Sequence, residues 1–136
     1  MDKIITVYGD GNTGKTTVIN EIYDFLIKNG ATVVHKKKQI DGDQNDFTAV
    51  LSYKGKNIAF LSMGDYRTVV DNHVVKFKKH DIFITALNKR FATIGTVWFK
   101  NSNFIYKVDK TMANSMFLSS LKSYFLNSKK ICLFEF

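Results

Sequence analysis

The sequence contains no proline and only one cysteine, Cys132, in 136 residues. A single cysteine cannot form a disulfide within the chain or build a thiolate zinc cluster, so a reducing compartment is expected. No apolar run approaches the roughly 20 residues that a membrane-spanning helix needs. With no secretion signal either, we expect a cytoplasmic protein without a membrane partner. Because no proline, repeat or low-complexity tract marks a linker, residues 1–136 are expected to form a single domain.

Arginine is also scarce, with only Arg67 and Arg90, yet the chain carries a formal net charge of +8. Basic residues gather at 35–38, 76–80, 89–90 and 129–130. A positive field attracts a small anionic ligand or a nucleic-acid backbone, and its sign alone does not choose between them. Predicted core strands separate the clusters, and no recognition helix or base-stacking motif accompanies them. We therefore favour a small anionic ligand, with nucleic acid kept as an alternative.

Glycine is concentrated in one informative stretch near the start of the chain. It consists of Gly9, Asp10, Gly11, Asn12, Thr13, Gly14, Lys15, Thr16 and Thr17. These residues match the phosphate-loop pattern G-x-x-x-x-G-K-[ST], in which backbone N–H groups surround an anion and the lysine contacts the β- and γ-phosphates. The hydroxyl after the lysine binds Mg²⁺. We expect all nine residues to bind a nucleoside triphosphate, with Lys15 also catalytic and Thr16 a metal ligand.

The segments on either side of this stretch fit the same interpretation. Residues 3–8 are apolar and β-branched, which is typical of a buried parallel strand. After the loop, apolar residues at three- and four-residue spacing predict a helix that ends at Asn29-Gly30. Phosphates would then lie at a helix N-terminus, which favours negative charge. Over about residues 3–29 the chain resembles the P-loop NTPase superfamily. The resemblance implies ATP or GTP as ligand and Mg²⁺ as cofactor.

The remaining elements are expected from hydrophobic periodicity. Strands are predicted at 31–35, 81–87, 104–108 and 131–136, a loop at 39–46, a hairpin of 47–53 with 57–63, and helices at 66–77 and from Thr111 onward. Residues 92–100 are expected to be helical or irregular. With right-handed crossovers, this order predicts a three-layer α/β P-loop fold, in which helices cover both faces of a mostly parallel sheet of about five to six strands with one antiparallel hairpin.

A P-loop enzyme also needs a carboxylate that holds the water shell of the metal. Asp65 is the best match, although the end of the preceding apolar strand is Ser62 and the acid comes three residues later. Asp65 is therefore predicted as a metal and catalytic residue, and a helix cap is its alternative role. Asp41 and Asp43 form a rival pair after the second predicted strand, where ordinary turn chemistry explains them equally well.

Cations that neutralise the transferring phosphoryl group form the third requirement. Lys89 and Arg90 follow the strand at 81–87, and Arg90 is predicted to be catalytic. Arg67 is a second candidate. The sequence Asn88-Lys89-Arg90-Phe91 lacks the acid of the guanine-specifying N-K-x-D motif, so specificity for GTP is not supported.

Two classes of function follow from these residues. The first is a Mg²⁺-dependent enzyme of the P-loop class that hydrolyses ATP or GTP or transfers its γ-phosphate. Within this class, a small-molecule or nucleotide kinase is the alternative to a simple NTPase. The second class is a nucleotide-binding or nucleic-acid-associated regulator with little turnover.

Overall fold

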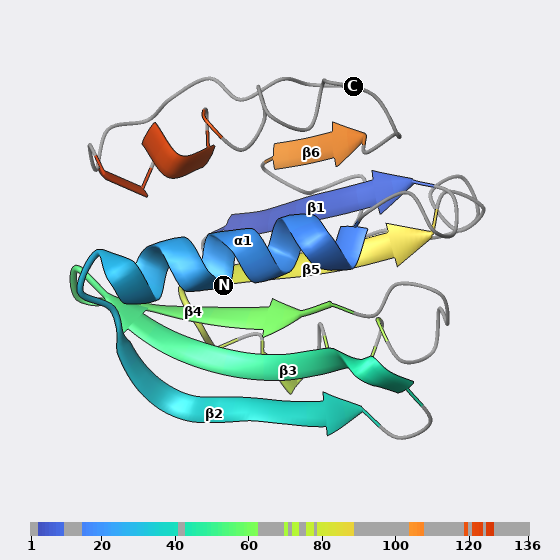
Figure 1. The fold of residues 1–136 in the computed structure, drawn as a ribbon, viewed down its shortest axis with the longest axis horizontal. Coiled ribbons are helices and arrows are strands. Elements are labelled where there is room, and N and C mark those ends of the chain that lie inside the picture. The colour runs from blue at the N-terminus through green and yellow to red at the C-terminus, as the bar shows by residue number, and fades with distance from the viewer. Residues whose placement is uncertain are drawn as a thin grey trace.

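The computed structural model describes residues 3–9, 15–40, 43–62, 70, 72–73, 76–77, 79–88, 104–107, 119, 121–123 and 125–126 (Figure 1). Its continuous elements are β1 (Lys3–Gly9), α1 (Lys15–Lys28), β2 (Thr32–Ile40), β3 (Asp43–Tyr53), β4 (Lys56–Leu61), β5 (Ile82–Asn88) and β6 (Phe104–Lys107).

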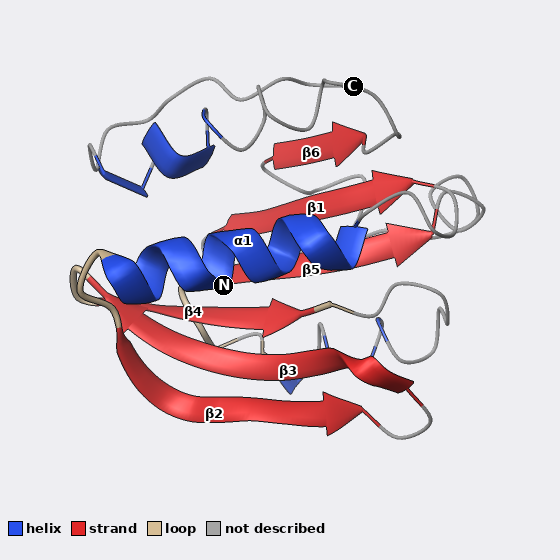
Figure 2. Ribbon diagram, viewed as in Figure 1, coloured by secondary structure: helices blue, strands red, loops and turns tan. Residues whose placement is uncertain are grey.

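The six described strands form one sheet in the order β2-β3-β4-β5-β1-β6 (Figure 2). Parallel pairing joins β4 to β5, β5 to β1 and β1 to β6. Antiparallel pairing joins β3 to β2 and to β4. Among the described strands, β3 thus runs against the other five and lies inside the sheet. β3 therefore begins at the side of the sheet where β1, β4 and β5 end. We call this side, formed by the last residues of those strands and the first residues of β3, the phosphate-loop edge.

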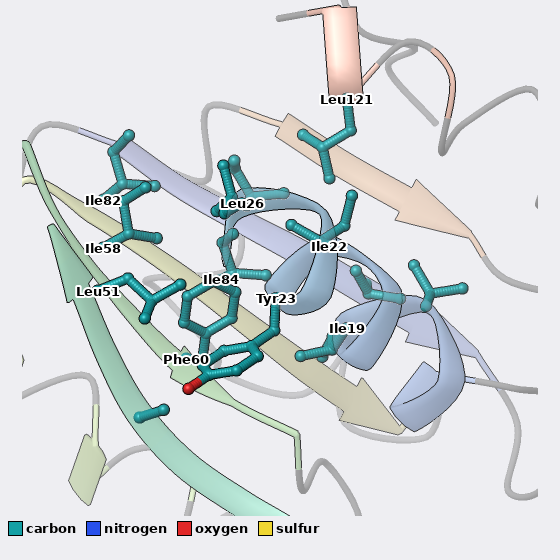
Figure 3. Close-up of a cluster of buried hydrophobic side chains, with 14 of the residues drawn as sticks. Ile19, Ile22, Tyr23, Leu26, Leu51, Ile58, Phe60, Ile82, Ile84 and Leu121 are labelled. Carbon is teal, nitrogen blue, oxygen red and sulfur yellow. The ribbon is translucent and has the colours of Figure 1, made fainter. Parts of the chain in front are cut away.

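α1 packs against one face of the central strands of the sheet (Figure 3). The helix points Ile19, Ile22 and Leu26, each 0% exposed, at the strands. The ring of Tyr23 meets that of Phe60 edge to face, with centroids 5.5 Å apart. α1 ends at Lys28 and is followed by Gly30, whose φ of 100° lies in the left-handed region that glycine adopts readily. The Ala31 N–H donates to the Leu26 carbonyl at 2.9 Å. The predicted helix and its glycine stop are confirmed.

The opposite face of the central strands is buried as well. Alternate residues of β5 point away from α1, and Phe83 among them is 0% exposed. Its ring contacts the ring of Phe77, with centroids 5.6 Å apart. Val70 is also 0% exposed, so both of these residues from the predicted 66–77 helix are buried. The centre of the sheet is therefore a core on both sides, as its unbroken apolar runs require.

The three-layer P-loop fold expected from the sequence, mostly parallel and with helices on both faces, is wrong. The sheet is mixed, and within the described ranges α1 is the only helix that covers it as a continuous element. On the opposite face, residues 70, 72–73 and 76 are helical. The physical cause of the mixed pairing is the short connection between β2 and β3, since a parallel neighbour would need a crossover of a dozen or more residues.

The expected loop at residues 39–46 is also wrong. β2 continues to Ile40 and β3 starts at Asp43, so polar residues extend both strands. Every residue from Thr32 to Gln39 is exposed, which removes the alternation of apolar and polar residues that marks a half-buried strand. The edge position of β2 therefore explains why the pattern was misleading.

The predicted hairpin is confirmed as β3 and β4. Its two-residue turn has positive φ at Lys54 (49°) and Gly55 (77°), the conformation that matches the twist of paired strands. The Lys54 ammonium donates to the carbonyl oxygens of Phe125, at 3.1 Å, and Leu126. Phe125 is 5% exposed, so the turn holds a C-terminal segment against the core. The strand at 104–108 is confirmed as β6, whereas 92–100 and 131–136 lie outside the described residues.

Candidate functional site

The glycine-rich stretch lies between a strand and a helix. β1, a strand of the sheet interior, ends at Gly9, and α1 begins at Lys15. The first turn of α1 contains no acidic residue, which keeps the helix N-terminus favourable to an anion. The intervening residues, from Asp10 to Gly14, lie outside the described residues.

Lys15 and Thr16 occupy the first turn of the helix. Lys15 is 7% exposed, unlike Lys28 in the last turn of the same helix, which is exposed. Thr16 is half-buried, and Thr17 is exposed. A lysine is rarely buried to this extent unless it has polar or charged partners. The burial therefore sets Lys15 apart from the exposed lysine of the same helix.

The side chain of Thr16 contacts a carboxylate that the sequence interpretation missed. Its Oγ1 donates to Oδ1 of Asp46, on β3, at 3.1 Å. The Oγ of Ser62, directly after β4, donates to the same oxygen at 3.0 Å. Asp46 is 6% exposed and Ser62 is 2% exposed. The first turn of α1 and the adjoining ends of β3 and β4 thus meet at one buried carboxylate.

Ser62 fixes the position of this carboxylate through the backbone. Its Oγ accepts from the Phe47 N–H at 2.8 Å, and its own N–H donates to the Phe47 carbonyl at 3.0 Å. With its oxygen accepting from the backbone, the single hydroxyl proton is directed to Asp46. In the sequence, Ser62 stands at the strand end where P-loop enzymes usually have the acid. It instead orients an acid contributed by the neighbouring antiparallel strand.

This arrangement is chemically suited to a hard cation. Because the Thr16 hydroxyl donates its hydrogen bond to Asp46, the lone pairs of Thr16 Oγ1 are left for a metal. Carboxylate and hydroxyl oxygens are the ligands that Mg²⁺ prefers, and such sites are usually completed by water and phosphate. Within the described ranges no three His, Cys, Asp or Glu side chains cluster to hold a metal. Thr16 and Asp46 therefore offer oxygen ligands of the kind that Mg²⁺ takes together with water and phosphate.

Other residues predicted for the site are placed only in part. Gly9 pairs with Asn88 at the end of β1. Asp43 is the first residue of β3, and its side chain is not described. The predicted catalytic and metal residues Asp65 and Arg90 lie outside the described residues, as do Asp41, Arg67 and Lys89. The roles assigned to them stay predictions.

A lysine from the sheet edge reaches the second turn of α1. The Lys37 ammonium donates to Oδ1 of Asn20 at 2.8 Å and lies 4.4 Å from the ring centroid of Tyr23 and 4.6 Å from that of Phe47. Nδ2 of Asn20 donates to the Thr16 carbonyl at 3.0 Å. Burial raises the pKa of the Tyr23 phenol, and the Asp24 carboxylate raises it further. A positive charge is thereby held one helical turn from the Thr16–Asp46 contact.

Sequence reasoning missed Asp46 because it placed this residue in a loop. The available signal was its position directly before the apolar run that starts at Phe47. That signal says nothing about a partner 30 residues away on α1.

Comparison with family models, with curated proteins and with solved structures finds no match to this chain. In the described part of the chain, no helix combines the length and apolar character needed to cross a membrane. Arguments about function therefore depend on the residues at the phosphate-loop edge.

Proposed function

We propose that this protein binds a nucleoside triphosphate together with Mg²⁺ at residues 9–17, and that it hydrolyses the triphosphate or transfers its γ-phosphate. The observation that carries the proposal is the buried contact of Thr16 with Asp46, beside the N-terminus of α1. The motif supplies the phosphate-binding residues and the contact supplies the missing carboxylate. A metal bound there would neutralise charge on the phosphates.

Each residue of the site has a distinct role in this proposal. Lys15 places a positive charge at the β- and γ-phosphates. Thr16 offers its oxygen to the cation while its hydroxyl stays hydrogen-bonded to Asp46 Oδ1. Asp46 orients the hydroxyl and accepts from metal-bound water. Ser62 keeps Asp46 in place and is a positioning residue, because its hydroxyl acts through the carboxylate.

The burial of Asp46 supports a role for its carboxylate in holding the water shell of a bound metal. Removing a carboxylate from water costs several kcal/mol even in a relaxed protein. The Thr16 and Ser62 hydroxyls offset part of that cost, at roughly 1.5–3 kcal/mol for each hydrogen bond to a charged group. A cation bound beside Asp46 would stabilise the buried carboxylate further.

Binding can be tested by calorimetry with MgATP and MgGTP. Lys15→Ala is expected to weaken the affinity about tenfold to a hundredfold, the effect of losing a charge-assisted contact of about 1.5–3 kcal/mol. Lys28→Ala is the matched control, because it removes an exposed lysine from the other end of the same helix and should leave affinity unchanged. Unchanged affinity in folded Lys15→Ala would disprove the assignment of the loop.

Turnover can be tested by phosphate release with and without candidate acceptors. We expect Asp46→Asn to lower turnover by roughly 10²-fold, the usual scale for a positioned catalytic group. Asp65→Asn is measured in parallel, because Asp65 is the competing acid. A loss confined to Asp65→Asn would move the metal role to that residue. Tight binding without turnover in the wild-type protein would instead favour a regulator.

A further inference from the structure

The outer edge of the sheet presents an unusually basic strand to solvent. β2 is an edge strand, and all residues from Thr32 to Gln39 are exposed. Its central four residues are His35, Lys36, Lys37 and Lys38, which we call the basic edge. No acidic residue occurs in β2.

The charges of the basic edge are not neutralised by the adjoining strand. His35 faces Val50 of β3, and Lys38 faces Thr48, so the paired positions carry no carboxylate. Lys37 is held by Asn20 and two aromatic rings, all of them uncharged. Within the described ranges, Lys36 and Lys38 have no side-chain partner. The strip therefore keeps its positive charge in a chain that is already +8 overall.

Edge strands commonly bind another strand, but this edge is poorly suited to it. The β2–β3 pairing shifts register between Val33 and His35, between His35 and Lys38, and between Gln39 and Ile40. Bulges and lysines both oppose the addition of a regular strand. Binding of a second copy of the chain or of an acidic β-strand peptide to the backbone of β2 is therefore disfavoured. A partner would instead be bound by the side chains of β2.

The sequence favoured a small anionic ligand for the basic clusters, but β2 proves to be an exposed edge strand, and we propose that the basic edge binds the phosphate backbone of single-stranded nucleic acid. Lys37 is turned to Asn20 on α1, so Lys36 and Lys38 are left to place two charges along the exposed strand, an extended arrangement that suits a linear polyanion. Reading a duplex groove would require a protruding helix or a free two-stranded ribbon. β2 belongs to a ribbon whose other strand, β3, is paired to β4, so the ribbon is not free to enter a groove.

The test is fluorescence anisotropy of labelled dT20 and rU20 between 50 and 200 mM salt, using the full chain. The double variant Lys36→Gln/Lys38→Gln is compared with Lys28→Gln/Lys79→Gln, which removes the same charge at exposed lysines elsewhere. Loss of two phosphate contacts should weaken binding about tenfold or more at 50 mM and flatten the slope of log affinity against log salt by about 1.4. The control should stay within about twofold of wild type.

Further measurements keep the outcomes separate. Lys36→Arg/Lys38→Arg should restore binding, because it restores the charge. Equal loss in both glutamine variants, or no salt-dependent binding to either oligonucleotide, would overturn the proposal. So would binding to phosphatidylserine vesicles alone, since that would identify a lipid surface as the partner. Lys15→Ala should bind oligonucleotide normally, so failure of the nucleotide site and failure of the basic edge are distinguishable.

Discussion

Replacing Asp46 by asparagine should separate a functional carboxylate from a structural one, because the two roles predict different effects on stability. Both hydroxyl donors point to the same oxygen, Oδ1, and an asparagine carbonyl accepts both hydrogen bonds in the same place. The variant therefore keeps an acceptor for both hydroxyls, removes the negative charge and replaces Oδ2 by an amide nitrogen. If the carboxylate is retained for a metal, the protein without ligand should tolerate its loss.

The magnitude follows from two opposing contributions. Weakening two charged hydrogen bonds to neutral ones removes about 2–3 kcal/mol in total. Removing a charge from a site that is 6% exposed offsets part of this loss, because the carboxylate no longer has to be desolvated. We therefore expect Asp46→Asn to lower the unfolding free energy in urea, without metal or nucleotide, by less than Asp46→Ala does. Asp46→Ala should lose about 1–3 kcal/mol, because the Ser62 hydroxyl is left without its acceptor.

The same urea titration with MgATP completes the experiment. A ligand at a hundred times its Kd stabilises the wild-type protein by about 2.7 kcal/mol, and a tenfold weaker affinity removes about 1.4 kcal/mol of that gain. Asp46→Asn should show this smaller gain. Asp81→Asn is the control: Asp81 Oδ2 accepts the Asn57 N–H at 2.8 Å, so its loss should lower stability without changing the MgATP effect. Our reasoning fails if Asp46→Asn destabilises the ligand-free protein as much as Asp46→Ala and keeps the full gain.

Three further predictions concern the fold. Lys54→Met should lower the unfolding free energy by about 1–2 kcal/mol in urea, because the Phe125 and Leu126 carbonyls lose their donor, and an unchanged midpoint would mean that the contact is unimportant. Phe83→Ala should cost about 3–5 kcal/mol, since its ring is fully buried on the face opposite α1, and a loss below 1 kcal/mol would argue against a core there. The raised pKa of Tyr23 means that its neutral form favours the folded state, so stability should be unaffected below about pH 10 and fall above it. Tyr23→Phe should remove that part of the alkaline loss, and identical pH profiles of the unfolding midpoint would contradict it.

Sequence patterns predicted the elements whose apolar residues follow the burial of the segment. β1 and β5 are continuous apolar runs, and α1 repeats its apolar residues with helical spacing, so local periodicity was sufficient. For β2 the pattern predicted a strand only at residues 31–35 and missed its extension to Ile40, because none of the residues from Thr32 to Gln39 is buried. The Thr16–Asp46 contact was beyond reach for a different reason. It joins residues 30 positions apart through the reversed direction of β3, which depends on strand pairing and not on any local pattern.

The reversed direction of β3 also affects how such a site could diversify. A carboxylate at the start of a strand lies next to the connection that precedes the strand, here the short link between Ile40 and Asp43. Surface connections accept inserted residues far more readily than strands do. Lengthening this link would place new side chains near Asp46, at the proposed nucleotide site, while the ladder from Thr48 to Tyr53 kept its register. A change of substrate could therefore arise by insertion at one turn, without altering the buried strands.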